Sequence, residues 1–214
     1  MHEKHIKVET GFVILTAVFV ASLVIASVLA SKIIQVGAFF VPAGVLAYSL
    51  TFLCTDIVGE VYGKDASRKV VLSGFIALVA VLLLTQVSLV WTAAPFWQNQ
   101  DAFNSVLGAT NRIIIASLVA YIISQYTDVW VFSRLKAMTN GRFFWLRNNG
   151  STALSQLIDS VIFISIAFYG VMPLFELIIG QWVIKLLIAL LDTPIAYALV
   201  SLWRRPRDRT QVST

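Results

Sequence analysis

The sequence predicts an all-α integral membrane protein with six transmembrane helices. Of its 214 residues, 58% are hydrophobic and only 13% are charged, whereas soluble domains carry about 25% charged residues. The mean hydropathy is +0.84. Apolar runs long enough to cross a bilayer follow one another along the chain. Basic residues gather in every second connection between these runs, as in a multi-pass protein.

Each predicted span is an apolar run of about 20 residues, the length that a bilayer core roughly 30 Å thick requires. The first run, from Phe12 to Ile34, is longer than the apolar region of a signal peptide, which has about 7–15 residues. We expect a single transmembrane domain over residues 1–214. Its predicted spans are 10–35, 43–62, 69–93, 110–133, 150–170 and 174–203.

Aromatic residues mark the two membrane surfaces. Trp91 and Trp97 lie at one predicted boundary, and Trp130 and Trp145 lie at the other, which is the pattern of interfacial aromatic belts. Segment 95–109 carries large apolar side chains at helical spacing. We therefore expect a short amphipathic helix along the membrane surface before the fourth span.

Lysines and arginines set the predicted orientation. They precede span one, lie between spans two and three and between spans four and five, and follow span six. The positive-inside rule then places both termini in the cytoplasm. Because this topology accounts for nearly all of the net charge of +5, the charge implies a lipid bilayer as partner and no nucleic acid.

Several function classes are excluded by missing residues and motifs. Cys54 is the only cysteine, and His2 and His5 are the only histidines. The sequence therefore predicts no disulfide framework and no zinc site. It contains no phosphate-binding loop for ATP, no Gly-x-Ser-x-Gly and no His-Glu-x-x-His. We expect neither an enzyme nor a resident cofactor.

Polar side chains inside the spans are the strongest functional signal. A charge at the centre of a bilayer costs at least about 2.5–3.5 kcal/mol, so several such charges are expected to face a polar interior. Four spans carry polar side chains at helical spacing, which directs them toward one shared cavity. These residues, with flanking aromatics, are Phe52, Asp56, Glu60, Tyr121, Gln125, Asp128, Asn149, Gln156, Asp159, Gln181, Lys185 and Asp192.

Such a cavity suits a small polar heterocycle. Carboxylates accept paired hydrogen bonds, and amides both donate and accept. Together they can read a planar edge of alternating donors and acceptors, such as a guanine-like ring presents. Aromatic side chains such as Phe52 and Tyr121 would stack on the ring face. This chemistry leaves open whether the ligand is a nucleobase or another vitamin-like solute.

Two motifs resemble those of a known family. The first is Thr51-Phe52-Leu53-x-Thr55-Asp56-x-x-x-Glu60-x-Tyr62-Gly63-Lys64 in span two. The second is Arg147-Asn148-Asn149-Gly150-Ser151-Thr152-x-x-Ser155-Gln156-x-x-Asp159-Ser160 at the start of span five. Both are similar to signatures of the queuosine precursor transporters, also called the vitamin uptake transporter family. The motif order and the six-span layout agree over nearly the whole chain.

The resemblance implies a multi-pass importer in the bacterial inner membrane. Its substrate would be 7-cyano-7-deazaguanine, with the 7-aminomethyl analogue as a further candidate; both are precursors of the modified tRNA base queuosine. The resemblance implies Asp56, Glu60, Asn149, Gln156 and Asp159 as substrate-binding residues. To these we add Gln125, Phe52 and Tyr121 from the polar faces of the spans.

The remaining intramembrane charges, Asp128, Lys185 and Asp192, suit ion coupling or ion pairing. Lys185 would pair with Asp192, two turns away, or with a carboxylate on another helix, or contact the substrate. Asp128 or Asp159 would carry a coupling proton, because burial raises carboxyl pKa values. Facilitated diffusion would need no coupling ion.

Alternatives remain open at this stage. The chain would also suit the substrate-binding membrane subunit of a multi-component ATP-driven importer, with Ala17, Ala21, Ala26 and Ala30 forming a small-residue docking face on span one. A three-plus-three inverted repeat is compatible with the similar Ser-Gln-x-x-Asp patterns at 124–128 and 155–159. The sequence also leaves a homo-oligomer open.

Overall fold

The computed structural model of the chain describes residues 2–139, 144–188, 190 and 191, with most of their side chains. Within this part the chain is mostly helical, and the predicted sixth span, 174–203, lies partly outside it. A helical segment covers residues 174–188. The labelled helices are α1 (His2–Leu29), α2 (Gly44–Tyr62), α3 (Lys64–Val90), α4 (Gln100–Met138) and α5 (Phe144–Phe168).

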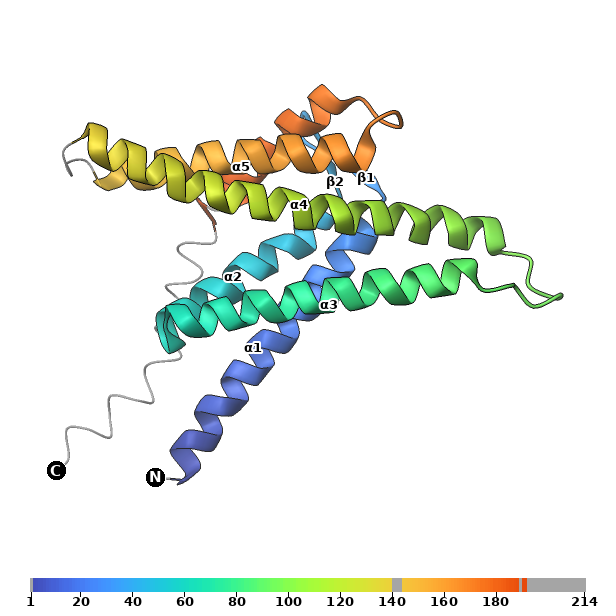
Figure 1. Cartoon of the computed structure of the whole chain (residues 1–214), viewed down its shortest axis with the longest axis horizontal. Helices are drawn as coiled ribbons and strands as arrows, with labels where there is room; N and C mark the ends of the chain where they lie inside the picture. Colours follow the sequence, from blue (N-terminus) through green and yellow to red (C-terminus); the bar gives the residue numbers. More distant parts are fainter. Residues whose placement is uncertain (1, 140–143, 189, 192–214) are drawn as a thin grey trace.

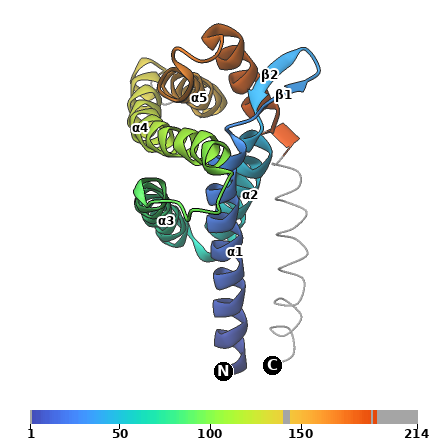
Figure 2. The same ribbon diagram turned by 90° about the vertical axis from the view of Figure 1, so that its right-hand side faces the viewer.

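The helices form a bundle (Figure 1). Helices α4 and α5 run side by side and share the most extensive helix contact, while α3 runs below α4 in the view of Figure 1. Helices α1 and α2 pack against each other at a slant to this layer, and both contact α3. Figure 2 shows a small β-hairpin beside the orange helical segment 174–188 at one end of the bundle.

The described helices are those of a multi-pass membrane protein. Four of them are long and apolar enough to cross a bilayer, over Thr10–Leu29, Gly44–Tyr62, Asp65–Val90 and Gln100–Ser124. These ranges overlap the first four predicted spans. Apolar side chains point outward, and Leu72 on α3 is 59% exposed, as expected for a surface that faces lipid. The six-span count and the cytoplasmic termini stay predictions.

A β-hairpin between α1 and α2 was not predicted. Strand β1 (Ile33–Val36) pairs antiparallel with strand β2 (Phe39–Pro42). The first span was therefore predicted too long, because α1 ends at Leu29 and the chain turns at Ser31 and Lys32. The strands join through a two-residue loop in which Gly37 has φ +60°, a conformation that glycine adopts at little cost.

The hairpin packs against the helical segment 174–188. Val41 is fully buried and forms an apolar cluster with Val45 and Ile184. The backbone of Phe40 lies so close to Gly180 that a Cβ atom there would be 2.2 Å from the Phe40 carbonyl oxygen. The hairpin thus holds the start of α2 against the segment 174–188.

The structure also corrects the expectation for residues 95–109. Helix α4 is continuous over 39 residues, so the predicted surface helix and the fourth span are one element from residue 100 onward. No proline interrupts residues 100–138. Gly108 destabilises the helix by about 1 kcal/mol relative to alanine, which a helix of this length tolerates.

Small residues set the close approach of α1 and α2. The ideal Cβ position at Gly44 lies 2.3 Å from the Ala26 carbonyl oxygen and 3.0 Å from the Ala30 Cβ. Ala26 and Ala30 are therefore buried inside the chain, whereas Ala17 and Ala21 are exposed. Two of the four alanines of the predicted docking face therefore pack inside the chain, and the other two remain on its surface.

Arg112 connects α4 to the end of α5. Its Nε donates to the Ile166 carbonyl at 2.6 Å, and its Nη2 donates to the Tyr169 carbonyl at 2.9 Å. A cation at the carboxyl end of a helix satisfies free carbonyl groups and favours the helix dipole. The contact fixes the register in which α4 and α5 pack.

We predict opposite effects of one methyl group at two helical glycines. Gly180→Ala should lower the melting temperature in detergent, because the new Cβ meets the Phe40 backbone. Gly108→Ala is the matched control, since a Cβ there meets nothing within 4 Å and alanine improves helix propensity by up to about 1 kcal/mol. Equal melting temperatures for the two variants would contradict the observed hairpin packing.

Candidate functional site

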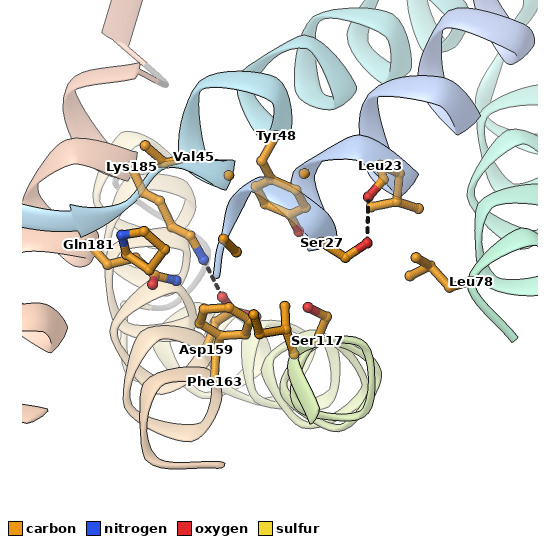
Figure 3. A pocket seen from close by; sticks show the side chains of 15 residues that line it. Leu23, Ser27, Val45, Tyr48, Leu78, Ser117, Asp159, Phe163, Gln181 and Lys185 are labelled. Atoms are coloured by element: carbon orange, nitrogen blue, oxygen red, sulfur yellow. Dashed lines mark hydrogen bonds and ion pairs between the residues drawn. The ribbon is translucent and has the colours of Figure 1, made fainter. Parts of the chain in front are cut away.

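A cavity of about 70 Å³ lies between the helices, next to the end of β2. Its lining comes from α1, the end of β2, α2, α3, α4, α5 and the segment 174–188 (Figure 3). Most lining atoms are apolar. The polar exceptions are the side chains of Ser27, Tyr48, Ser117, Asp159, Gln181 and Lys185.

A buried ion pair forms part of this lining. The Lys185 ammonium donates to Oδ2 of Asp159, and the two side chains are 6% and 12% exposed. Figure 3 shows the two side chains pointing toward each other from the segment 174–188 and α5. Two charges leave water at a cost of several kcal/mol each unless they are paired and hydrogen-bonded. The structure therefore gives Lys185 a carboxylate partner on another helix, one of the alternatives left open above.

Tyr48 on α2 completes the polar end of the cavity, and the sequence analysis did not select it. The Lys185 nitrogen lies 5.4 Å from the centre of the Tyr48 ring, which is within cation–π range. Phe52 contacts Tyr48 edge to face, with ring centres 5.0 Å apart, and is not part of the cavity lining. Phe52 therefore supports the aromatic residue that faces the cavity. Tyr48 lies one helical turn before Phe52, and this spacing is the sequence signal that would have suggested Tyr48 as a site residue.

Helix α4 approaches Asp159 from the other side. The Ser124 hydroxyl lies 3.5 Å from Oδ1 of Asp159, a long contact, and also donates to the Tyr121 carbonyl at 3.1 Å. The Tyr121 ring packs edge to face against Phe75 of α3, with centres 4.7 Å apart. Tyr121 is not part of the cavity lining. Its observed contact is with α3.

Gln181 lines the cavity one helical turn before Lys185. Gln181 is 5% exposed, and its side-chain oxygen Oε1 has no hydrogen-bond partner among the described residues. Oε1 of Gln156 and Oγ of Ser160 on α5 are likewise buried without a partner in the described part of the chain. A buried polar atom without a partner costs about 1–3 kcal/mol. A ligand donor would satisfy Gln181, since this side chain reaches the cavity.

Asp56 and Glu60 are exposed on α2 and are not part of this cavity lining. They follow Tyr48 by 8 and 12 residues, which places them roughly 12 and 18 Å farther along the helix axis. Asp159, Lys185 and Gln181 thus share one cavity lining, to which these two carboxylates do not belong. Their role in substrate binding stays a prediction.

Other predicted residues lie outside what the structure describes. The side chains of Gln125, Asp128 and Asn149 are not among the described side chains, although their backbone belongs to α4 and α5. Asp192 follows the last described residue. Among the described residues, no three histidine, cysteine or acidic side chains are grouped so as to hold a metal ion.

Residues 42–199 match the protein family described as "Putative vitamin uptake transporter". The chain belongs to this family. The matched range contains every cavity residue except Leu23, Ala26, Ser27 and Ala30. It therefore includes Tyr48, Asp159, Gln181 and Lys185.

Curated relatives carry a more specific name. A "Probable queuosine precursor transporter" of Bacillus subtilis is 36% identical over 72% of this chain and 69% of its own length. A protein of the same name from Haemophilus influenzae is 29% identical over 59% of this chain and 51% of its own length. The "Queuosine precursor transporter" of Escherichia coli is 29% identical over 59% of this chain and 54% of its own length. No solved structure matches this family member.

We predict that breaking the buried Lys185–Asp159 pair lowers the melting temperature. Asp159→Asn leaves the Lys185 charge buried without compensation and should destabilise the protein by about 3–5 kcal/mol, seen as a melting temperature roughly 10 °C lower in detergent. Replacing both charges, with Asp159→Leu and Lys185→Met together, should recover much of this loss because no unpaired charge remains.

The exposed pair of Asp65 and Arg68, 3.4 Å apart, supplies the matched control. Asp65→Asn should leave the melting temperature nearly unchanged, because exposed ion pairs contribute little. A melting temperature for Asp159→Asn equal to that of Asp65→Asn would show that the buried pair does not stabilise the fold.

Proposed function

We propose that this chain is a transporter of a queuosine precursor, 7-cyano-7-deazaguanine or its 7-aminomethyl analogue, in a bacterial inner membrane. The names of three relatives and membership of a transporter family support the substrate class. The observation that carries the proposal for the site is the buried Lys185–Asp159 pair at one end of a largely apolar cavity. The base would bind in this cavity.

The cavity chemistry fits a flat, uncharged heterocycle with a polar edge, such as the 7-cyano compound, better than the 7-aminomethyl analogue, whose amine is a cation at neutral pH. The Tyr48 ring offers an aromatic face, and apolar residues such as Phe163 and Leu78 cover the rest of the lining. The ammonium of Lys185 donates hydrogen bonds, while Asp159 and Gln181 accept them. Since the lysine and aspartate charges cancel, a neutral base enters without leaving a net charge in the membrane interior.

Transport requires that the cavity open to each side in turn. Its lining comes from α1, α2 and α3 and also from α4, α5 and the segment 174–188. A relative movement of these two groups of helices would therefore open the cavity without unfolding any helix. We propose that Asp56 and Glu60, toward the α2–α3 turn, contact the substrate along the route beyond the cavity, with Asn149, Gln156 and Gln125 as further contacts.

The alternative role, as the substrate-binding subunit of an ATP-driven importer, is not favoured by the relatives, which are named as transporters. The two roles differ in one measurable respect. A complete transporter moves the base across a membrane unaided, whereas a binding subunit captures it without uptake.

We predict uptake by the purified chain alone. Liposomes that contain only this protein should accumulate labelled 7-cyano-7-deazaguanine. Tyr48→Leu should reduce the rate about tenfold, because stacking of a base on an aromatic ring is worth roughly 1–3 kcal/mol. Tyr48→Phe is the matched control and should retain most of the activity. Binding without uptake would favour the subunit role, and the absence of both would contradict the proposed substrate.

A further inference from the structure

Gln181 is the cavity residue with an unmet hydrogen-bonding requirement. It is 5% exposed, it lines the cavity, and its carbonyl oxygen Oε1 has no donor among the described residues. It takes no part in the Lys185–Asp159 pair. A buried acceptor of this kind favours a ligand that brings an N–H group to it.

Lys185 supplies the complementary group on the same face. Residues 181 and 185 are one helical turn apart, which separates their Cβ atoms by about 5–6 Å. The ammonium has three protons, and Asp159 accepts one of them. Gln181 and Lys185 thus offer an acceptor and a donor from neighbouring turns of the same helical segment.

We propose that Gln181 determines specificity for a 2-amino base. Its carbonyl oxygen accepts a hydrogen bond from the exocyclic amino group, while Lys185 donates to the ring carbonyl of the same edge. This inference rests on the proposed function, since it concerns the base bound in the same cavity. Asp159 then acts as a positioning residue that holds the Lys185 ammonium at the cavity wall.

The geometry has a consequence for discrimination among bases. A base without the amino group leaves the Gln181 carbonyl buried and unpaired, and sites of this kind reject such analogues strongly. A base that keeps the amino group but meets an apolar residue at position 181 loses the same hydrogen bond. Removing either partner should therefore produce a similar loss of affinity.

The experiment compares two ligands on the detergent-purified full chain by equilibrium binding. The ligands are 7-cyano-7-deazaguanine and the same compound without its 2-amino group. The unmodified protein should bind the amino compound at least tenfold more tightly, a measurement that depends on no variant. Gln181→Met, which has similar volume, should weaken binding of the amino compound about tenfold and should not weaken binding of the other ligand, because the methionine leaves no carbonyl unpaired.

Two further variants complete the test. Gln181→Glu keeps an acceptor at this position and should retain the preference for the amino compound. Gln86→Met, at an exposed position on α3, should behave like the unmodified protein. Equal affinities of the unmodified protein for both ligands, or an undiminished preference in Gln181→Met, would overturn the inference alone. Failure of the unmodified protein to bind either ligand would overturn the proposed function and this inference together.

Discussion

The requirement to keep two opposite charges paired and away from lipid organises the described part of this protein. Lys185 and Asp159 belong to different helices, and each would be costly alone in a membrane interior. Their pairing holds the segment 174–188 against α5 at one level of the bundle. The Tyr48 ring and the Ser124 hydroxyl approach the same pair from α2 and α4. The polar end of the cavity is therefore assembled from four helical elements around one interaction.

Close backbone contacts at two glycines allow these elements to pack together. Gly44 lets α2 approach α1 at Ala26, and Gly180 lets the segment 174–188 approach Phe40 of the hairpin. Membrane helices gain little from the hydrophobic effect when they associate, so tight van der Waals packing at small residues carries much of the stability. These contacts place the apolar part of the cavity beside the ion pair, which suits a ligand with one polar edge and an apolar body.

Much of the fold follows from signals that are local in the sequence. Hydropathy located the four described spans, and the cost of intramembrane charge identified Asp159 and Lys185 as residues that need a polar partner. The hairpin was missed because its β-branched residues continue the apolar run of the first span. Tyr48 was missed because a tyrosine in an apolar helix has no pattern of its own until its neighbours in space are known.

The sequence by itself determined the membrane class, the family and the residue types available for binding, because composition, helical period and motif order are properties of the chain read in order. Only the tertiary structure decided that Lys185 pairs with Asp159, that Gln181 and Tyr48 line the cavity with this pair, and that Asp56 and Glu60 do not. Helical spacing specifies which side chains share a face of one helix. The relative height and rotation of neighbouring helices depend on contacts such as those at Gly44 and Gly180, between residues far apart in the sequence.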